Sequence, residues 1–260
     1  MILSDYFRTN KNLDIMFYSL FCLYRSPIMV ALSTKLFKCT DAIPIDDLFQ
    51  KLKKAKEYKE IIDNPETGEE VTLLTTIEDI KKIDNQKIIR GTIKYDYLIP
   101  LKQREPITKF VKQTDSVRFS FLFGSLYFIA HERDSADAVA DKIPKIIMKG
   151  IPDPILKCYI SPESIERFLS THSHVLTHSS IGEVTIPRFS GSQFQGSEFD
   201  QDPRYREFRD HGKLRSIRLQ LRKYGWSISL NRNACVTFFS NVTEDQMEDF
   251  MRREIIPICD

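Results

Sequence analysis

The chain contains little glycine, 9 residues among 260, and it lacks the glycine-rich signatures that bind nucleotide phosphates. Neither GxxxxGK[ST] nor GxGxxG occurs, which argues against P-loop and dinucleotide-binding enzymes. GxSxG and HExxH are also absent, so no local signature of a serine hydrolase or a zinc protease is present. These absences favour a non-catalytic protein, and we expect no bound cofactor.

Cysteine is scarce as well, and the five cysteines form no CxxC pair. The missing pair removes the common zinc and thioredoxin-type signals. An odd number of widely spaced cysteines is typical of buried free thiols rather than of a disulfide framework. Because no signal peptide is evident either, we expect a cytoplasmic protein.

The chain carries almost no net charge, with 38 Lys and Arg against 36 Asp and Glu, which excludes a globally basic nucleic-acid binder. Charge is instead segregated along the sequence. Residues 63–79 contain six acidic side chains and no Lys or Arg, whereas residues 201–223 contain eight Lys and Arg against three Asp and Glu. A local excess of this kind matters more for an interaction surface than the net charge does.

Residues 15–37 are apolar and long enough to span a bilayer of about 30 Å. Arg25 and Pro27 fall in the middle of this stretch, where a charge is costly and proline disrupts a helix. Two strands, at 15–24 and 28–37, explain the same residues without that cost. We therefore expect no membrane contact.

The clearest secondary-structure signal lies in residues 213–240. Ile217, Leu219 and Leu221 alternate with polar side chains, which predicts a strand with one buried and one solvated face. Two further strands follow, with Trp226 in phase with the buried positions of the second. Thr243 and Gln246 then form a capping-box pattern that predicts a helix.

The remaining pattern predicts alternating helices and strands. We expect helices at 45–62, at 76–83, after Asp134 or Ser135, and after a Ser161 cap. We expect strands at 71–75, 87–101, 117–123, 125–131 and 184–186. Gly91 is a candidate bulge within the strand at 87–101.

These elements predict an α+β fold, a mostly antiparallel sheet with helices packed on one side. Residues 116–147 repeat the β-β-α order found near the C-terminus, so we expect two lobes built from such units. The stretch 150–154, GIPDP, opposes any helix across it and marks the boundary. The predicted lobes are residues 1–150 and residues 151–260, the second with a basic strand face.

Three of the five histidines lie close together, and imidazoles at such spacing are able to bind zinc. His172, His174 and His178 are weak metal-ligand candidates, since no cysteine lies nearby. The alternative, which we favour, is a helix C-terminus that runs into a polar strand. We therefore predict no metal site.

The basic segment is the strongest functional signal. Arginine forks suit phosphate oxygens, and interleaved aromatic rings are able to stack on bases. We expect a non-catalytic binding protein that presents an arginine-rich sheet face to a polyanion, with DNA or RNA as the first candidate. The predicted contacts are Arg204, Arg206, Lys213, Arg215, Arg218, Arg222 and Lys223.

Two alternatives stay open on sequence alone. The same face is suited to a protein partner or to a second copy of the chain as a structural subunit. A metal-dependent hydrolase or nuclease is also compatible with the sequence, because its carboxylates can come from distant segments without a local motif.

Overall fold

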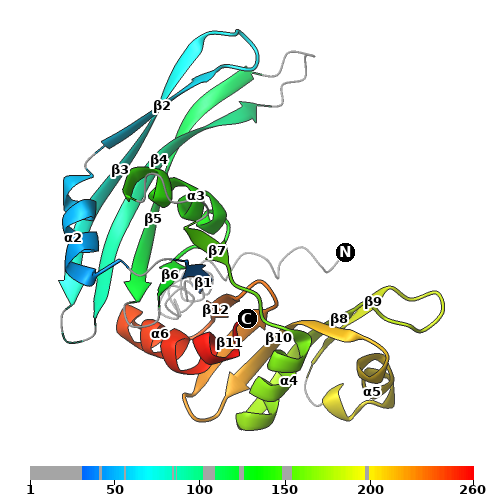
Figure 1. Ribbon diagram of the computed structural model, residues 1–260. Coiled ribbons are helices and arrows are strands. Elements are labelled where there is room, and N and C mark those ends of the chain that lie inside the picture. Colours follow the sequence, from blue (N-terminus) through cyan, green and yellow to red (C-terminus); the bar gives the residue numbers. More distant parts are fainter. Residues whose placement is uncertain are drawn as a thin grey trace, which may run out of the picture.

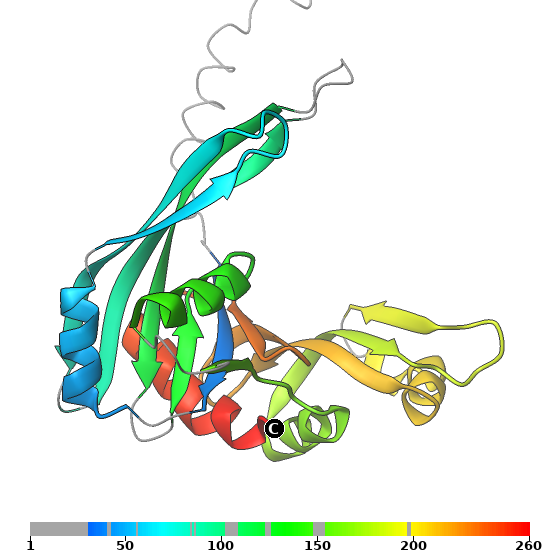
Figure 2. The ribbon, with the colours of Figure 1, turned by 45° about the horizontal axis from the view of Figure 1, so that its top comes forward.

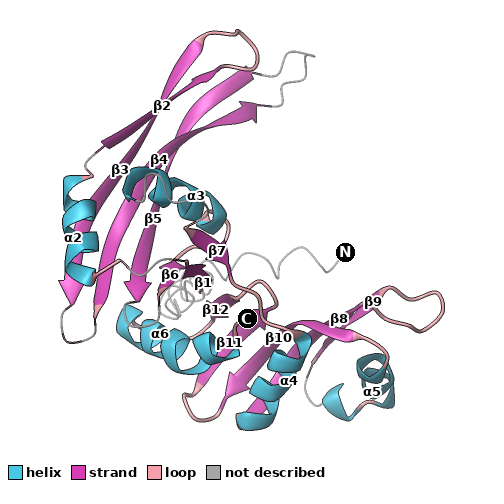
Figure 3. Cartoon of the chain, viewed as in Figure 1, coloured by secondary structure: helices cyan, strands magenta, loops and turns pink. Residues whose placement is uncertain are grey.

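The computed structural model describes residues 31–40, 43–55, 57–83, 85, 87–101, 109–122, 126–147, 154–196 and 199–260. In these residues, twelve strands form one open antiparallel sheet, accompanied by five α-helices (Figures 1 and 3). The predicted α+β class with a mostly antiparallel sheet is confirmed.

The sheet has the strand order β2-β3-β4-β5-β6-β1-β12-β11-β10-β8-β9, and β7 also pairs with β1. The strands are β1 (Leu32–Cys39), β2 (Glu57–Asp63), β3 (Glu70–Ile83), β4 (Ile88–Leu101), β5 (Lys109–Leu122), β6 (Tyr127–Ala130), β7 (Ile155–Lys157), β8 (His174–Gly182), β9 (Gly191–Gln195), β10 (Lys213–Leu221), β11 (Trp226–Asn231) and β12 (Cys235–Phe238).

The helices are α2 (Ile45–Lys54), α3 (Ala136–Ile147), α4 (Pro162–Thr171), α5 (Pro203–Asp210) and α6 (Glu244–Phe250). Three of them begin at side-chain caps that the sequence encodes. Ser161 caps α4, Asp202 caps α5, and Thr243 forms a full capping box with Gln246 at the start of α6. The caps predicted at Ser161 and Thr243 are confirmed.

Strand β1 joins the two halves of the sheet, because it pairs with β12 from Leu32 to Lys35 and with β6 from Lys35 to Lys38. Residues at the start of the described chain thus lie beside residues near its end. Every strand from β2 to β6 lies on one side of β1, and every strand from β8 to β12 lies on the other.

Each half of the sheet buries a different face. Neighbouring residues of a strand point to opposite faces, and in β1 Leu36 belongs to one apolar cluster while Phe37 belongs to the other. The Phe37 cluster lies under α2 and α3 and covers the β2–β6 half. The Leu36 cluster lies under α4 and α6 and covers the β8–β12 half. Helices α2 and α3 pack on one face of the sheet and α4 and α6 on the opposite face, where α6 also covers part of β4, β5 and β6.

The two ends of the sheet project from the rest of the molecule (Figures 1 and 2). Strands β3, β4 and β5 have 14 residues each and extend beyond α2 and α3 as an arm. A β-bulge interrupts β3, where Asp79 and Ile80 both lie opposite Gly91 of β4. The predicted irregularity at Gly91 is therefore present, with the extra residue in the partner strand. At the other end, β8, β9 and α5 project together.

The sequence predicted the elements of residues 213–251 correctly. Strands β10, β11 and β12 and helix α6 follow in the expected order, and Ile217, Leu219 and Leu221 are all fully buried. Trp226 stacks on Tyr224 and packs against Phe238 and Phe250, so it belongs to the core, as its phase predicted. The hairpin of β5 and β6 and helix α3 were also expected, and α3 continues through Pro144 to Ile147.

Three expected elements are wrong. The helix predicted over 45–62 ends at Lys54, and Glu57–Asp63 pairs with β3 as an edge strand. The short helix predicted over 76–83 is the second half of β3, since pairing with β4 outweighs the local cap signal of Thr76. No strand forms at 184–186, where Thr185 is instead hydrogen-bonded through N and Oγ1 to the carbonyl of His211.

The strand predicted over 28–37 is present from Leu32 onward as β1. The one predicted over 15–24 lies outside the described residues, as does most of the stretch 150–154. The boundary between two lobes near residue 150 therefore stays a prediction. Among the helices of the described residues, none has both the length and the apolar composition needed to cross a bilayer.

Gly91 provides a test of how closely the bulge is packed. A Cβ atom at this position would lie 2.6 Å from Ile80 Cδ1 and 2.7 Å from Phe119 Cζ. We expect Gly91→Ala to lower the free energy of unfolding by about 1–3 kcal/mol through overpacking, as measured by urea denaturation. Gly182→Ala is the matched control, since its Cβ would meet the flexible side chain of Arg215. Equal free energies of unfolding for the two variants would contradict the close packing around Gly91.

Candidate functional site

The β8–β12 half of the sheet leaves one face without a covering helix among the described elements, and polar side chains occupy it. Cross-strand pairing places six of them in one row across β1, β12, β11, β10, β8 and β9. A second, shorter row runs beside the first across β11, β10, β8 and β9. We call these residues the open face: Ser33, Thr237, Ser229, Arg218, His178 and Gln195 in the first row, and Asn231, Ser216, Ser180 and Gln193 in the second.

The open face contains no acidic side chain in either row, and all ten of its residues are exposed or half-exposed. A shallow pocket of 410 Å³ lies on it, with Arg218, His178, Gln195 and Asn231 in its lining. Arg133, which follows β6, also borders this pocket. The face ends at Lys35, which is buried and forms an ion pair of 2.7 Å with Asp137 of α3.

Arg218 occupies the centre of the open face. Its neighbours across the sheet are Ser229 on β11 and His178 on β8. The guanidinium group lies 3.9 Å from the centroid of the Phe239 ring, which is a cation–π contact. Stacking fixes the plane of the guanidinium and leaves its N–H groups available to a ligand.

Arg215 and Arg222 lie on either side of Arg218 along β10 and the turn that follows it, and both are exposed. Arg215 sits at a β-bulge opposite Ile181, and its side chain lies across the bare backbone of Gly182. No described carboxylate lies within 4.0 Å of Arg215, Arg218 or Arg222. Arg215, Arg218 and Arg222 are thus exposed cations without a carboxylate partner among the described residues.

The two lysines of the predicted set are less available. Lys213 is 3.0 Å from Glu183, which also pairs with Arg232. Lys223 is 3.2 Å from Glu254, and this contact turns it toward the side of the sheet that carries α6. Both side chains remain exposed, and such surface ion pairs are worth at most about 1 kcal/mol.

Arg204 and Arg206 lie on α5, away from the open face. Tyr205 and Phe208 of this helix pack against Phe194 of β9, whose side chain points opposite to Gln193 and Gln195. The helix therefore covers the other side of the sheet. The structure does not bring these two arginines together with the three of β10.

The three candidate histidines are also separated. His172 follows the last residue of α4, stacks on Phe168 and lies 2.9 Å from Glu254. His174 begins β8, and His178 lies on the open face. Among the described residues, no three His, Cys, Asp or Glu side chains come together in a group that would hold a metal ion.

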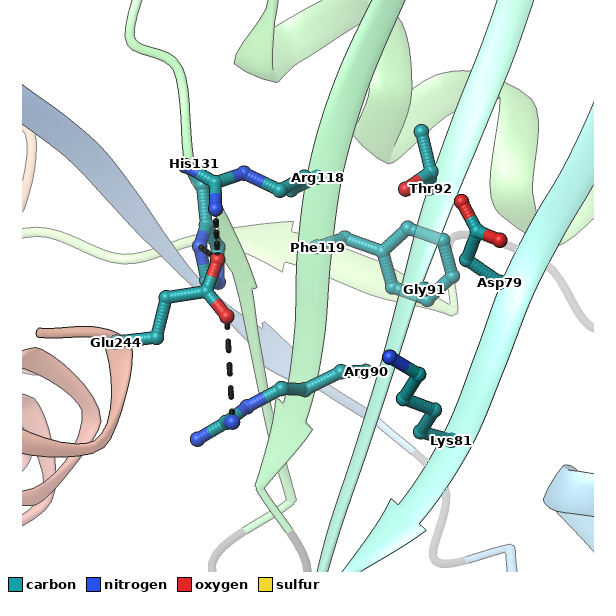
Figure 4. A pocket seen from close by; sticks show the side chains of 9 residues that line it. All are labelled: Asp79, Lys81, Arg90, Gly91, Thr92, Arg118, Phe119, His131 and Glu244. Carbon is teal, nitrogen blue, oxygen red and sulfur yellow. Dashed lines mark hydrogen bonds and ion pairs between the residues drawn. The ribbon is translucent and has the colours of Figure 1, made fainter.

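A second polar site lies where α6 meets β4, β5 and β6 (Figure 4). Arg90 binds the buried Glu248 through two hydrogen bonds of 2.9 and 2.6 Å, and also pairs with Asp245. Glu244 lies between Arg90 and Arg118 and contacts both. We call this group the α6 cluster: Arg90, Arg118, Ser120, His131, Glu244, Asp245 and Glu248.

Ser120, His131 and Glu244 lie next to one another in space, as the serine, histidine and acid of a hydrolytic triad do. Their hydrogen bonds, however, do not support nucleophilic attack by Ser120. Ser120 Oγ is 2.8 Å from His131 Nε2, but the hydroxyl donates its proton to Glu248 at 2.5 Å. Nε2 must then donate to Ser120, so the imidazole cannot accept the hydroxyl proton as it would in a triad. Ser120 is also fully buried, so a substrate has no access to it. The α6 cluster is a polar network, buried at Ser120, His131 and Glu248 and exposed at Arg118 and Asp245, that fixes α6 on the sheet.

The imidazole of His131 is neutral in this network. Burial, followed by the nearby Arg118 and Arg90, lowers the pKa of His131 to about 3. Its Nδ1 atom has no hydrogen-bond partner among the described residues and lies 3.8 Å from Glu244. Nothing in the sequence around His131 or Ser120 distinguished them, because the network depends on α6, more than 110 residues later.

Neither site can be interpreted by comparison. No protein-family model matches this chain, and no curated protein is significantly similar to it. The interpretation of function therefore depends on the geometry of the two sites.

Removing the carboxylate of Glu248 tests the α6 cluster. Glu248→Gln leaves the partly buried charge of Arg90 without its main partner, and we expect the free energy of unfolding to fall by about 3 kcal/mol. Asp245→Asn is the matched control on the same helix, because Asp245 is exposed and its loss should cost at most about 1 kcal/mol. Equal losses for the two variants in chemical denaturation would contradict the role assigned to Glu248.

The pKa of His131 makes stability depend on pH. The folded-state pKa, about 3, is below the ordinary value of 6.5, so between these limits the unfolded chain binds the extra proton and stability falls as pH decreases. Between pH 6.5 and about pH 4.5 we expect a loss of about 2 kcal/mol from this residue. His131→Gln should lack this part of the pH dependence in urea titrations. Identical pH profiles would show that His131 is protonated in the folded protein.

Proposed function

We propose that the open face binds a polyanion, with nucleic acid as the first candidate, and that the protein acts as a non-catalytic binding protein. The observation that supports this proposal most strongly is the surface around Arg218. Three exposed arginines, free of carboxylate partners, lie on or beside a face whose two rows contain no acid. A solvated face that served no ligand would normally mix charges of both signs.

The chemistry of the open face suits a phosphate backbone. Guanidinium groups bind phosphate oxygens through paired hydrogen bonds, and the hydroxyl and amide groups around them are the usual partners of phosphate and sugar oxygens. Arg215, Arg218 and Arg222 supply the positive charge, and Gln195, Ser229 and Asn231 supply neutral hydrogen-bonding groups. Arg133 adds a further cation at the border of the pocket.

The dimensions of the open face suit an extended single strand of nucleic acid. The first row crosses six strands, and five spacings of about 4.8 Å give a length of about 24 Å. Phe239 beneath Arg218 is half-exposed and offers an aromatic ring next to a cation. Surfaces that hold single-stranded nucleic acid combine these same two features.

The test is a binding titration against labelled single-stranded RNA and DNA of mixed sequence at several salt concentrations. We expect affinity to fall steeply as salt rises, because each neutralised phosphate releases counterions. The triple variant Arg215→Ala, Arg218→Ala, Arg222→Ala should bind more weakly. Its slope of log affinity against log salt should be smaller by about 2, at about 0.7 for each lost contact with a single strand.

A triple variant of α2, Lys51→Ala, Lys53→Ala, Lys54→Ala, is the matched control. It removes the same charge from exposed positions on a helix in the other half of the sheet and should leave binding unchanged. Undetectable binding at low salt, or equal losses in the two triple variants, would overturn the proposal. Arginine-dependent binding of polyglutamate without binding of either nucleic acid would assign the open face to an acidic protein partner instead.

A further inference from the structure

Two cysteines that are far apart in the sequence meet on the side of the sheet opposite the open face. Cys158 follows β7 and is buried, and Cys259 follows the last helical turn of the chain, Ile256–Ile258, and is half-exposed. Both belong to the apolar cluster under α4 and α6. Their position is separate from the open face and from the α6 cluster.

Backbone pairing places the two residues next to each other. The N–H of Asp260 donates to the carbonyl of Tyr159 at 2.9 Å, and each of these residues directly follows one of the cysteines. This hydrogen bond holds the two segments side by side with the cysteines at neighbouring positions, and a disulfide requires roughly 4.4–6.8 Å between Cα atoms. Both side chains also lie in the same apolar cluster, Cys158 within its buried part and Cys259 packed against it.

The environment divides the roles of the two sulfur atoms. The hydrogen bond from Cys259, together with the nearby charge of Lys38, lowers the pKa of Cys158, whereas Cys259 acts as the donor and its pKa is raised. Burial raises the pKa of the neighbouring Cys39 to about 12. Of the two thiols, Cys158 is thus the one that ionises more readily, and thiolates are the species that react with oxidants.

We propose that Cys158 and Cys259 form a reversible disulfide when the protein meets a peroxide. The Cys158 thiolate attacks one oxygen of hydrogen peroxide, the O–O bond breaks, and water leaves after proton uptake, which oxidises Cys158 to a sulfenic acid. The sulfur of Cys259 then attacks the sulfenic sulfur, and a second water leaves as the S–S bond forms. The two thiols lose two electrons in total, and the peroxide is reduced to two water molecules.

The bridge would attach the segment after α6 to the segment after β7. It would close a loop of about 100 residues that contains β8 to β12 together with α4, α5 and α6, and long loops lose the most entropy in the unfolded chain when cross-linked. Oxidation should therefore stabilise the half of the sheet that carries the open face.

The experiment treats the purified full-length chain with hydrogen peroxide, blocks the remaining thiols in denaturant and maps the non-reduced peptides by mass spectrometry. We expect one cross-linked pair of peptides, containing Cys158 and Cys259, that disappears after reduction. The Tm of the oxidised protein should exceed that of the reduced protein by several degrees.

Two variants keep the outcome interpretable. Cys259→Ala, at a half-exposed position, should lose both the cross-link and the rise in Tm, and Cys39→Ala should retain both. The proposal is overturned if folded protein gives no cross-link between Cys158 and Cys259. A bridge from Cys158 to Cys39 or Cys22, or oxidation confined to Cys259, would overturn it equally.

Discussion

The pairing of β1 with β12 and β7 on one side and with β6 on the other is the constraint on which the rest of the structure depends. It joins strands from both ends of the described chain into one sheet and covers edges that would otherwise be free to pair with other molecules. Open sheets of more than about 10 strands tend to curl or to split into packed layers. Here the sheet stays continuous, and the main covered face changes at β1 from one half to the other, while α6 also covers part of β4, β5 and β6.

The division of the core explains why a polar face exists at all. Alternation along β10 commits Ile217, Leu219 and Leu221 to the cluster under α4 and α6, so Ser216, Arg218 and Gln220 must face the other way. On the opposite side of β1 that face lies under α3 and is apolar. The open face therefore begins where α3 stops, at the ion pair of Lys35 with Asp137. Its position follows from the fold, and its charge follows from the sequence of β10.

The sequence predicted those elements whose signals are local. Alternation defined β10, and the cap at Thr243 defined α6. It failed where a local helical pattern conflicted with strand pairing. Leu52, Ala55 and Tyr58 keep helical spacing through residue 58, yet pairing with β3 makes Glu57–Asp63 a strand.

The same reasoning applies to the candidate site. Alternation with Ile217, Leu219 and Leu221 was enough to predict that Arg218 points away from the core, and the structure shows it exposed. The positions of His178, Gln195 and Ser229 in one row depend on the register of four strands, which no local pattern encodes. Arg204 and Arg206 looked continuous with the arginines of β10 because they are close in sequence. Helix α5 carries them to the other side of the sheet, since its aromatic residues pack on Phe194.

Protection of individual arginines tests most directly whether a polyanion binds at the open face. Phenylglyoxal modification can be mapped by mass spectrometry with and without a saturating single-stranded oligonucleotide. If it does, we expect the oligonucleotide to protect Arg215, Arg218 and Arg222 and to leave the exposed Arg253 as reactive as before. Protection of Arg204 and Arg206 instead, or no difference among these arginines, would contradict it.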